Sequence, residues 1–455
     1  MLAAILAYVV SQLLIGFWVA RRVRSESDFL VAGRSLGYTL TTFSVFATWF
    51  GAETCIGSAG EAYRNGLSGT TADPFGYSLC LLLMGLLFAA PLWRLGLSTF
   101  ADLFRIRYGA SAERVMVLVV APTSVMWAAA QIRAFGQVLG ASSSLSTEIA
   151  TAIAAAVVLV YTVLGGSRGD AIGDVIHGGV LAVGLLLLAA LSLAHGDLAQ
   201  LAQLEPGRLS LVGPGASALD VLEQWAIPIC GSVMAPELVQ RVLSARSPTV
   251  ARRSTLAATG IYFALGLIPV GMGLLAVRSL PGIEDPEQVL MLQAQRYLPG
   301  ALYVLVAGAL VSAILSTVDT ALLVAGSLLA HNVLVPLVPD GERRALALNR
   351  ACVAACGLVA YALARSAESV YGLVEEASAL GSSGVLVAAL FALFGRFGES
   401  RSAIAALVTG VVVYTAGAHA LGLDHPYLLS LASALGAYTI AALIPPRGAS
   451  RGVVA

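Results

Sequence analysis

Long apolar runs alternate with short polar segments along nearly the whole chain. A membrane-spanning helix needs about 20 apolar residues to cross a hydrocarbon core of about 30 Å. Thirteen runs are long enough, at roughly 2–20, 37–62, 75–96, 114–141, 147–165, 172–195, 218–241, 254–278, 298–331, 346–365, 369–395, 402–421 and 427–445. The pattern predicts an all-α polytopic membrane protein with about 13 transmembrane helices and no soluble domain.

Arginines orient the predicted helices. Alternating loops, beginning with 21–36, carry twenty arginines, the opposite loops carry five, and Arg133 lies inside a run. Because basic residues favour the cytoplasmic side, we expect the N-terminus outside and the C-terminus inside. The first run has Arg21, Arg22 and Arg24 behind it and no basic residue ahead of it, the reverse of a cleaved signal peptide, so we expect a retained helix.

Composition narrows the function classes. The chain has 455 residues, of which 58% are hydrophobic and 11% charged, with a net charge of zero. A soluble domain carries about 25% charged residues, so a soluble enzyme, a nucleic-acid-binding protein and a disordered chain are excluded. The five cysteines lie within apolar runs and do not read as a disulfide framework. The five histidines are scattered and form no H-E-x-x-H motif, which argues against an intramembrane metalloenzyme.

Two of the runs are interrupted near their centres. The second run contains Gly51 and Glu53, and the seventh contains Pro228, Gly231 and Pro236, about 180 residues further on. Each interrupted run opens a block of five runs. Matching broken helices in two inverted halves are typical of secondary transporters and mark the binding site, although Gly and Pro also occur in ordinary membrane helices.

The ninth run carries a stripe of oxygen ligands. Residues 313, 316, 317 and 320 share one helical face, and their hydroxyl and carbonyl oxygens suit a hard cation. Asp174 and Asp319 add carboxylates within the apolar core, where charges are rare and usually functional. Serine and threonine hydroxyls can instead bond back to their own helix, as we expect for Ser312 or Thr320.

Five motifs together carry a family resemblance: DFLVAGR at 28–34, ATWFGAE at 47–53, YTVLGG at 161–166 with Asp174, QR at 240–241 and SAILST at 312–317. In this order and on these runs, they make nearly the whole chain resemble the sodium:solute symporters, which include bacterial proline, galactose, sialic acid and pantothenate carriers and the choline transporter.

The resemblance implies a LeuT-like core of two inverted five-helix repeats. The first repeat would cover 37–195 and the second 196–395. Residues 1–36 would form an accessory helix with a cytoplasmic loop, and 396–455 two accessory helices with a short tail. It also implies a secondary active transporter working by alternating access in the bacterial inner membrane.

The resemblance assigns sodium ligands residue by residue. The common sodium site would use the carbonyls of Ala47, Phe50 and Ala313 with the hydroxyls of Ser316 and Thr317. A second site, found in some members, would use Asp174, Ser316, Asp319 and Thr320. Asp319 stands where several members have serine, and it could strengthen sodium binding or take up a proton. Sodium is the expected coupling ion, and no other cofactor is expected.

The substrate of such a symporter lies between the broken helices. Candidate ligands in this chain are Trp49, Glu53, Thr54, Asp73, Phe75, Trp127, Gln131, Arg133, Trp225 and Ser232. Arg133 either binds a substrate carboxylate or pairs with an internal acid such as Glu53 or Asp174. The tryptophans favour a quaternary ammonium group, unless they only pack or form an interfacial belt.

These residues favour sodium-coupled symport of a carboxylate or a zwitterion such as an amino acid or betaine. A choline-like or sugar transporter is the alternative, and a channel or a transporter-like receptor is the alternative of a different class. The expected partners are sodium, a small organic solute and the lipid bilayer, with no nucleic acid.

Overall fold

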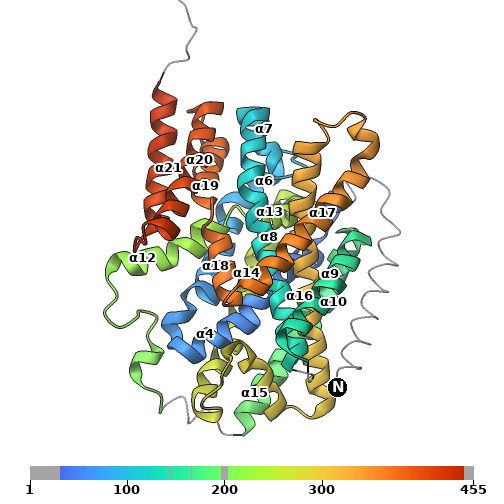
Figure 1. The fold of residues 1–455 in the computed structure, drawn as a ribbon, viewed down its shortest axis with the longest axis vertical. Coiled ribbons are helices and arrows are strands. Elements are labelled where there is room, and N and C mark those ends of the chain that lie inside the picture. The colour runs from blue at the N-terminus through green and yellow to red at the C-terminus, as the bar shows by residue number, and fades with distance from the viewer. Residues whose placement is uncertain (1–30, 142, 144, 165–166, 196–202, 445–455) are drawn as a thin grey trace, which may run out of the picture.

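The computed structural model describes residues 31–141, 143, 145–164, 167–195 and 203–444, and helices dominate these ranges (Figure 1). The long continuous helices are α8 (Ala110–Ala141), α9 (Thr147–Leu164), α10 (Ser167–Ala194), α14 (Pro248–Ser279), α16 (Gly300–Ser327), α17 (Gly341–Ser366), α20 (Ser400–Thr415) and α21 (Pro426–Leu443). The bent pair α18 (Val370–Ala379) and α19 (Ser382–Phe394) turns by 44° between its two parts.

Shorter segments complete the described part of the chain. They are η1 (Ala32–Arg34), η3 (Gly66–Thr70), η4 (Thr71–Gly76), α5 (Tyr77–Leu83), η5 (Met84–Phe88), α6 (Ala89–Arg94), α7 (Ala101–Tyr108), η6 (Pro206–Leu209), η8 (Pro286–Gln288), α15 (Val289–Tyr297), η9 (Leu328–Leu334) and η10 (Ala416–Ala420). Within the described ranges, eight helical stretches are long and apolar enough to cross a membrane, or up to nine with the bent pair. The count of thirteen stays a prediction, and its first run lies outside the described residues.

The second predicted run is broken where its glycine lies. Helix α3 (Tyr38–Trp49) ends at Phe50, whose φ of −87° and ψ of 73° leave the helical region. The chain becomes helical again in η2 (Glu53–Gly57) and α4 (Ser58–Asn65). Backbone carbonyls near such a break lose helical partners and can serve as ligands.

The seventh predicted run is broken in the same way. Helix α12 (Ala218–Ala226) starts with a capping box between Ser217 and Asp220 and continues into η7 (Ile227–Gly231). A new helix, α13 (Pro236–Leu243), begins with proline, which cannot donate to the preceding turn. Both interruptions predicted from the sequence are therefore present.

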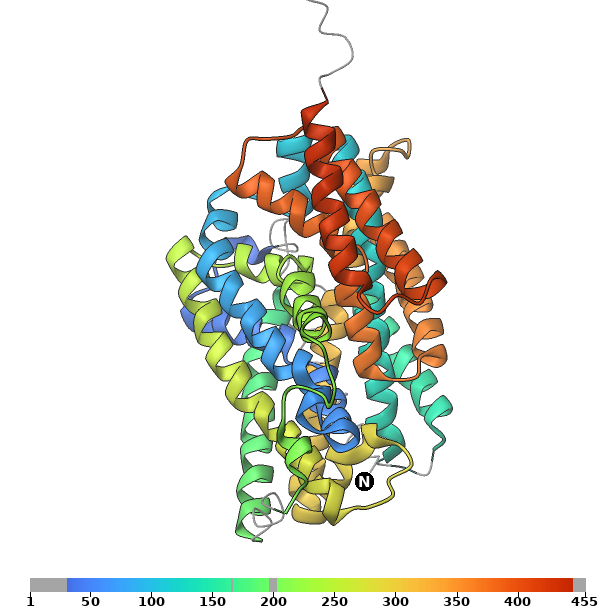
Figure 2. The same cartoon turned by 90° about the vertical axis from the view of Figure 1, so that its left-hand side faces the viewer.

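Helices α8 and α16 form the centre of the molecule. Helix α16 packs against α8, α10 and α17, and most of its surface is buried. Helices α20 and α21 pack on each other along the outside of the bundle (Figure 2), where most of their residues are only partly buried, as expected for contact with lipid. Helix α8 also contacts α20, while the broken second run packs through α3 against α14, α10, α13 and α16.

Candidate sodium and substrate site

Oxygen atoms from α3 and α16 converge at the first break. The hydroxyl of Thr317 lies 3.1 Å from the carbonyl oxygen of Ala313 and 3.3 Å from that of Ala47. Phe50 stands at the break itself, one turn beyond Ala47. The fold thus brings together residues assigned to the common sodium site that come from two segments about 270 positions apart.

Ser316 faces a buried carboxylate. Its hydroxyl donates to Asp174 Oδ1 at 2.5 Å, and the hydroxyl of Ser44 donates to Asp174 Oδ2 at 2.7 Å. Asp174 has no exposed surface. Ser316 therefore links α16 to the buried carboxylate of α10 beside Thr317.

A guanidinium group lies among the residues assigned to the second sodium site. Arg241 Nη2 donates to the hydroxyl of Thr320 at 2.8 Å and lies 3.5 Å from Asp174 Oδ2. Its Nε donates to the hydroxyl of Thr48 at 2.7 Å. Asp319 is 1% exposed on the same helix as Thr320.

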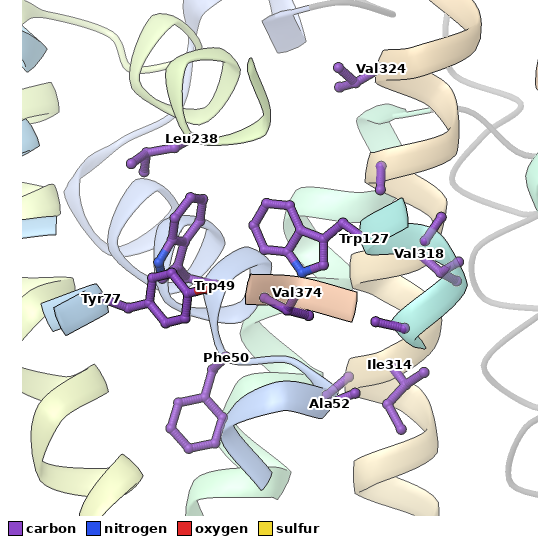
Figure 3. Packing of buried hydrophobic residues seen from close by; sticks show 14 of the residues in the cluster. Trp49, Phe50, Ala52, Tyr77, Trp127, Leu238, Ile314, Val318, Val324 and Val374 are labelled. Atoms are coloured by element: carbon purple, nitrogen blue, oxygen red, sulfur yellow. The ribbon is translucent and has the colours of Figure 1, made fainter. Parts of the chain in front are cut away.

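Aromatic rings form one wall of a central cavity. The rings of Trp49 and Trp127 meet edge to face with centroids 4.9 Å apart, and Tyr77 lies 6.3 Å from Trp49 (Figure 3). The cavity encloses about 570 Å³ of empty space, its open mouth included. Its lining residues are Trp49, Glu53, Tyr77, Val120, Thr123, Trp127, Gly231, Ser232, Met234, Ala235, Pro236, Glu237, Val374, Ala377, Ser378, Leu380, Ser382 and Val385.

Two buried carboxylates also line the cavity. Glu53 accepts a hydrogen bond of 2.8 Å from Gln131 Nε2, while Gln131 Oε1 accepts from the backbone N–H of Ala52 at 3.0 Å. Glu237 accepts a hydrogen bond of 2.5 Å from Ser124. The lining residues include no arginine, lysine or histidine. The cavity therefore has the polarity expected of a site for a cation.

A second polar cluster lies outside the lining residues. Asp73 accepts hydrogen bonds from Thr54 at 2.7 Å and from Tyr262 at 2.9 Å. All three side chains are fully buried. Thr54 and Asp73, predicted as substrate ligands, therefore bond to each other, and Phe75 packs against Phe263.

Arg133 is engaged at one end of the bundle. Its Nε lies 3.2 Å from Glu287 Oε2, and its other nitrogens donate at 2.9 Å to the carbonyl oxygens of Ala367 and Glu368. Glu287 also accepts from Gln137 at 3.1 Å and from the backbone N–H of Val370. Burial raises the pKa of Glu287, and the Arg133 guanidinium acts in the opposite direction.

The structure places Arg133 outside the lining of the cavity. Its guanidinium pairs with Glu287 instead of the expected Glu53 or Asp174. Trp225, half-buried on α12, is likewise absent from the lining. Arg133 lies six residues after Trp127 on α8, on another face of the helix, and it contacts Glu287 and the carbonyl of Ala367 there.

The chain matches the model of a known protein family over most of its length. The model of the sodium:solute symporter family matches residues 29–410. The chain belongs to the sodium:solute symporter family. Membership assigns sodium-coupled symport of a small organic solute and multi-pass membrane residence, and it agrees with the motifs found in the sequence.

Several relatives of this symporter are characterised transporters. The human high affinity choline transporter 1 is 27% identical over 454 residues, covering 94% of this chain and 77% of the relative. The Drosophila melanogaster choline transporter is 26% identical, and the match spans 62% of its length. The Bacillus subtilis high-affinity proline transporter PutP is 24% identical, covering 90% of both chains.

A solved structure confirms the predicted LeuT-like fold class. A Na+-coupled sialic acid symporter in a substrate-bound outward-open state superposes with a TM-score of 0.80 at 16% identity, covering 98% of both chains. Mhp1, a nucleobase-cation-symport-1 family transporter in a closed conformation, gives a TM-score of 0.61 at 15% identity. At these identities the likeness concerns the fold.

Sequence reasoning missed several residues of the symporter's cavity. Tyr77, Glu237 and Ser378 line it without having been predicted. Glu237 had a signal, because a carboxylate directly after Pro236 falls inside a broken helix. Tyr77 and Ser378 bond to each other at 2.9 Å across 301 positions of sequence, and no local pattern predicts such a pair.

Proposed function

We propose that this symporter carries a small organic cation with an alkylammonium group, driven by sodium. The proposal rests on the lining of the cavity. This lining combines the aromatic rings of Trp49, Trp127 and Tyr77 with two carboxyl groups, those of Glu53 and Glu237. Aromatic rings attract quaternary ammonium ions through their quadrupoles, by about 2 kcal/mol or more once the cation is desolvated.

The charge of the lining favours a cation over a carboxylate. An anionic solute would need a donor such as arginine, and Arg133 is held by Glu287 and two carbonyls outside the cavity. A cationic head group instead compensates the carboxylates that the apolar surroundings would otherwise leave unpaired. The choline transporters among the relatives support this choice of substrate class.

Sodium is proposed to bind where α3 breaks beside α16. The carbonyls of Ala47, Phe50 and Ala313 and the hydroxyls of Ser316 and Thr317 supply five oxygens, a ligand set suited to a hard cation. The convergence of Ala47, Ala313 and Thr317 supports this site.

A sodium ion at this site would couple to the solute through the break in α3. The same break positions Trp49 and Glu53 in the cavity, so a cation that fixes its geometry raises the affinity for the solute. A ligand shifts a conformational equilibrium only through its different affinities for the two states. We propose that sodium favours the outward-open state, and that solute binding permits closure and rocking.

The membrane orientation completes the proposal. With the N-terminus outside and the C-terminus inside a bacterial cytoplasmic membrane, the arginine-rich loops face the cytoplasm. An inward sodium gradient then drives uptake. The pairing of Arg133 with Glu287 would lie on the outer side.

Binding to the purified symporter tests the substrate class. Thermal-shift titrations with choline, betaine, L-proline and pantothenate, each in sodium and in potassium, should give stabilisation by choline that is largest in sodium. Stabilisation by proline or pantothenate alone would contradict the proposal. Saturable accumulation in proteoliposomes separates a symporter from a channel, which gives unsaturable flux, and from a receptor, which binds without accumulation.

A further inference from the structure

Arg241 lies at the position where a second coupling ion is expected. It comes from α13, and its guanidinium contacts α3 through Thr48, α16 through Thr320 and α10 through Asp174. Arg241 is 6% exposed, so these contacts are made in a desolvated environment. One side chain thus ties together three helices around the sodium site.

The donor set does not fit an additional sodium ion. Asp174 already accepts from Ser316 through Oδ1 and from Ser44 through Oδ2, and Oδ2 also faces Arg241. The Thr320 hydroxyl accepts from Arg241 and donates to the carbonyl of Ser316 at 3.1 Å. A sodium ion bound to Asp174, Ser316 and Thr320 would stand beside the guanidinium, and the repulsion in a low-dielectric interior would oppose it.

A cation already lies beside the buried carboxylate of this cluster. Asp174 has no exposed surface, and Arg241 Nη2 lies 3.5 Å from its Oδ2. A sodium ion bound there would place a second positive charge next to the guanidinium in the membrane interior, which is costly.

We propose that Arg241 is a tethered cation that takes the place of the second sodium ion, so that this symporter binds and carries one sodium ion per cycle. The inference rests on the proposed sodium site at Thr317 and departs from the second site that the family resemblance implied. Arg241 acts here as a positioning residue, because its contacts also orient Asp174 towards Ser316.

Counting bound sodium tests this inference directly. Saturation of the purified symporter with ²²Na⁺, measured by scintillation proximity with choline present, should give one ion per chain and a Hill coefficient near one. Two ions per chain would overturn the inference while leaving sodium coupling intact. No bound sodium would overturn the proposed sodium site itself, so the two failures are distinguishable.

Substitution of Arg241 gives a second, independent readout. Arg241→Gln removes the tethered charge and should raise the count from one ²²Na⁺ to two, while Arg241→Lys, which keeps the charge, should stay at one. A count of one in Arg241→Gln would overturn the role assigned to the guanidinium. Should Arg241→Gln fail to elute as a folded monodisperse species, the count in the unsubstituted chain decides alone.

Discussion

Trp49 and Trp127 reach the cavity from different helices, and the edge of one ring meets the face of the other. We expect Trp49→Ala to weaken choline binding by roughly 2 kcal/mol, or about 30-fold, because the cation loses an aromatic face in a desolvated site. Trp49→Phe should recover part of the affinity. Competition against radiolabelled choline measures the change, and Trp225→Ala, outside the cavity, is the matched control. Equal effects of the two alanine variants would contradict the aromatic site.

Thr317 contributes the hydroxyl that links α16 to the end of the broken helix α3. Thr317→Ala should raise the sodium concentration required for half-maximal uptake, since the ion loses one oxygen ligand. The rise should be about tenfold or more, on the basis of about 1.5 to 3 kcal/mol for a bond to a charged group. Thr317→Ser should restore the dependence. Sodium dependence that is unchanged in Thr317→Ala proteoliposomes would exclude the site.

At the scale of the helices, single glycines allow neighbouring elements to pack closely. A Cβ atom at Gly231 would overlap the carbonyl oxygen of Ser378, where η7 meets α18. Gly231→Ala should therefore lower the melting temperature and reduce solute binding. Gly260→Ala on α14 is the control, because open space surrounds that position. A melting temperature lowered equally in both variants would contradict the close-packing account.

Arg133 and Glu287 join α8 to η8 and to the segment between α17 and α18. Glu287→Gln should loosen this end of the bundle and cost about 1–3 kcal/mol, because it leaves a half-buried guanidinium without its charged partner. Spin labels at Glu284 and Ser366 should report a broader or longer distance distribution. Glu342→Gln, at the exposed start of α17, is the control, and an unchanged distribution would show that the pair does not hold the two segments together.

The sequence predicted the helices and their breaks better than it predicted which side chains contact each other. Apolar length marked the runs, and Gly51, Pro228 and Pro236 marked both breaks, because these residues act through the local backbone. The alignment of Ala313 with Thr317 followed from helical spacing. The pairing of Arg133 with Glu287 and of Arg241 with Asp174 spans 154 and 67 positions, and depends on how whole helices pack. Spacing along one helix carries no information on such contacts.

At the scale of the whole molecule, the fold decides which charged groups meet. Arg133 lies within a predicted run and favoured a carboxylate, since a guanidinium in the membrane needs an anion. The fold supplies an anion from Glu287 and places the carboxyl groups of Glu53 and Glu237 in the cavity lining. The proposed cationic solute therefore rests on contacts between helices, which the sequence alone does not give.

Uptake of radiolabelled choline into proteoliposomes tests the central claim most directly. With an inward sodium gradient, choline should accumulate above its external concentration, saturably, and the accumulation should disappear when potassium replaces sodium or when the gradient is dissipated. Choline accumulation that is indifferent to sodium, or sodium-driven accumulation of L-proline with none of choline, would contradict the account.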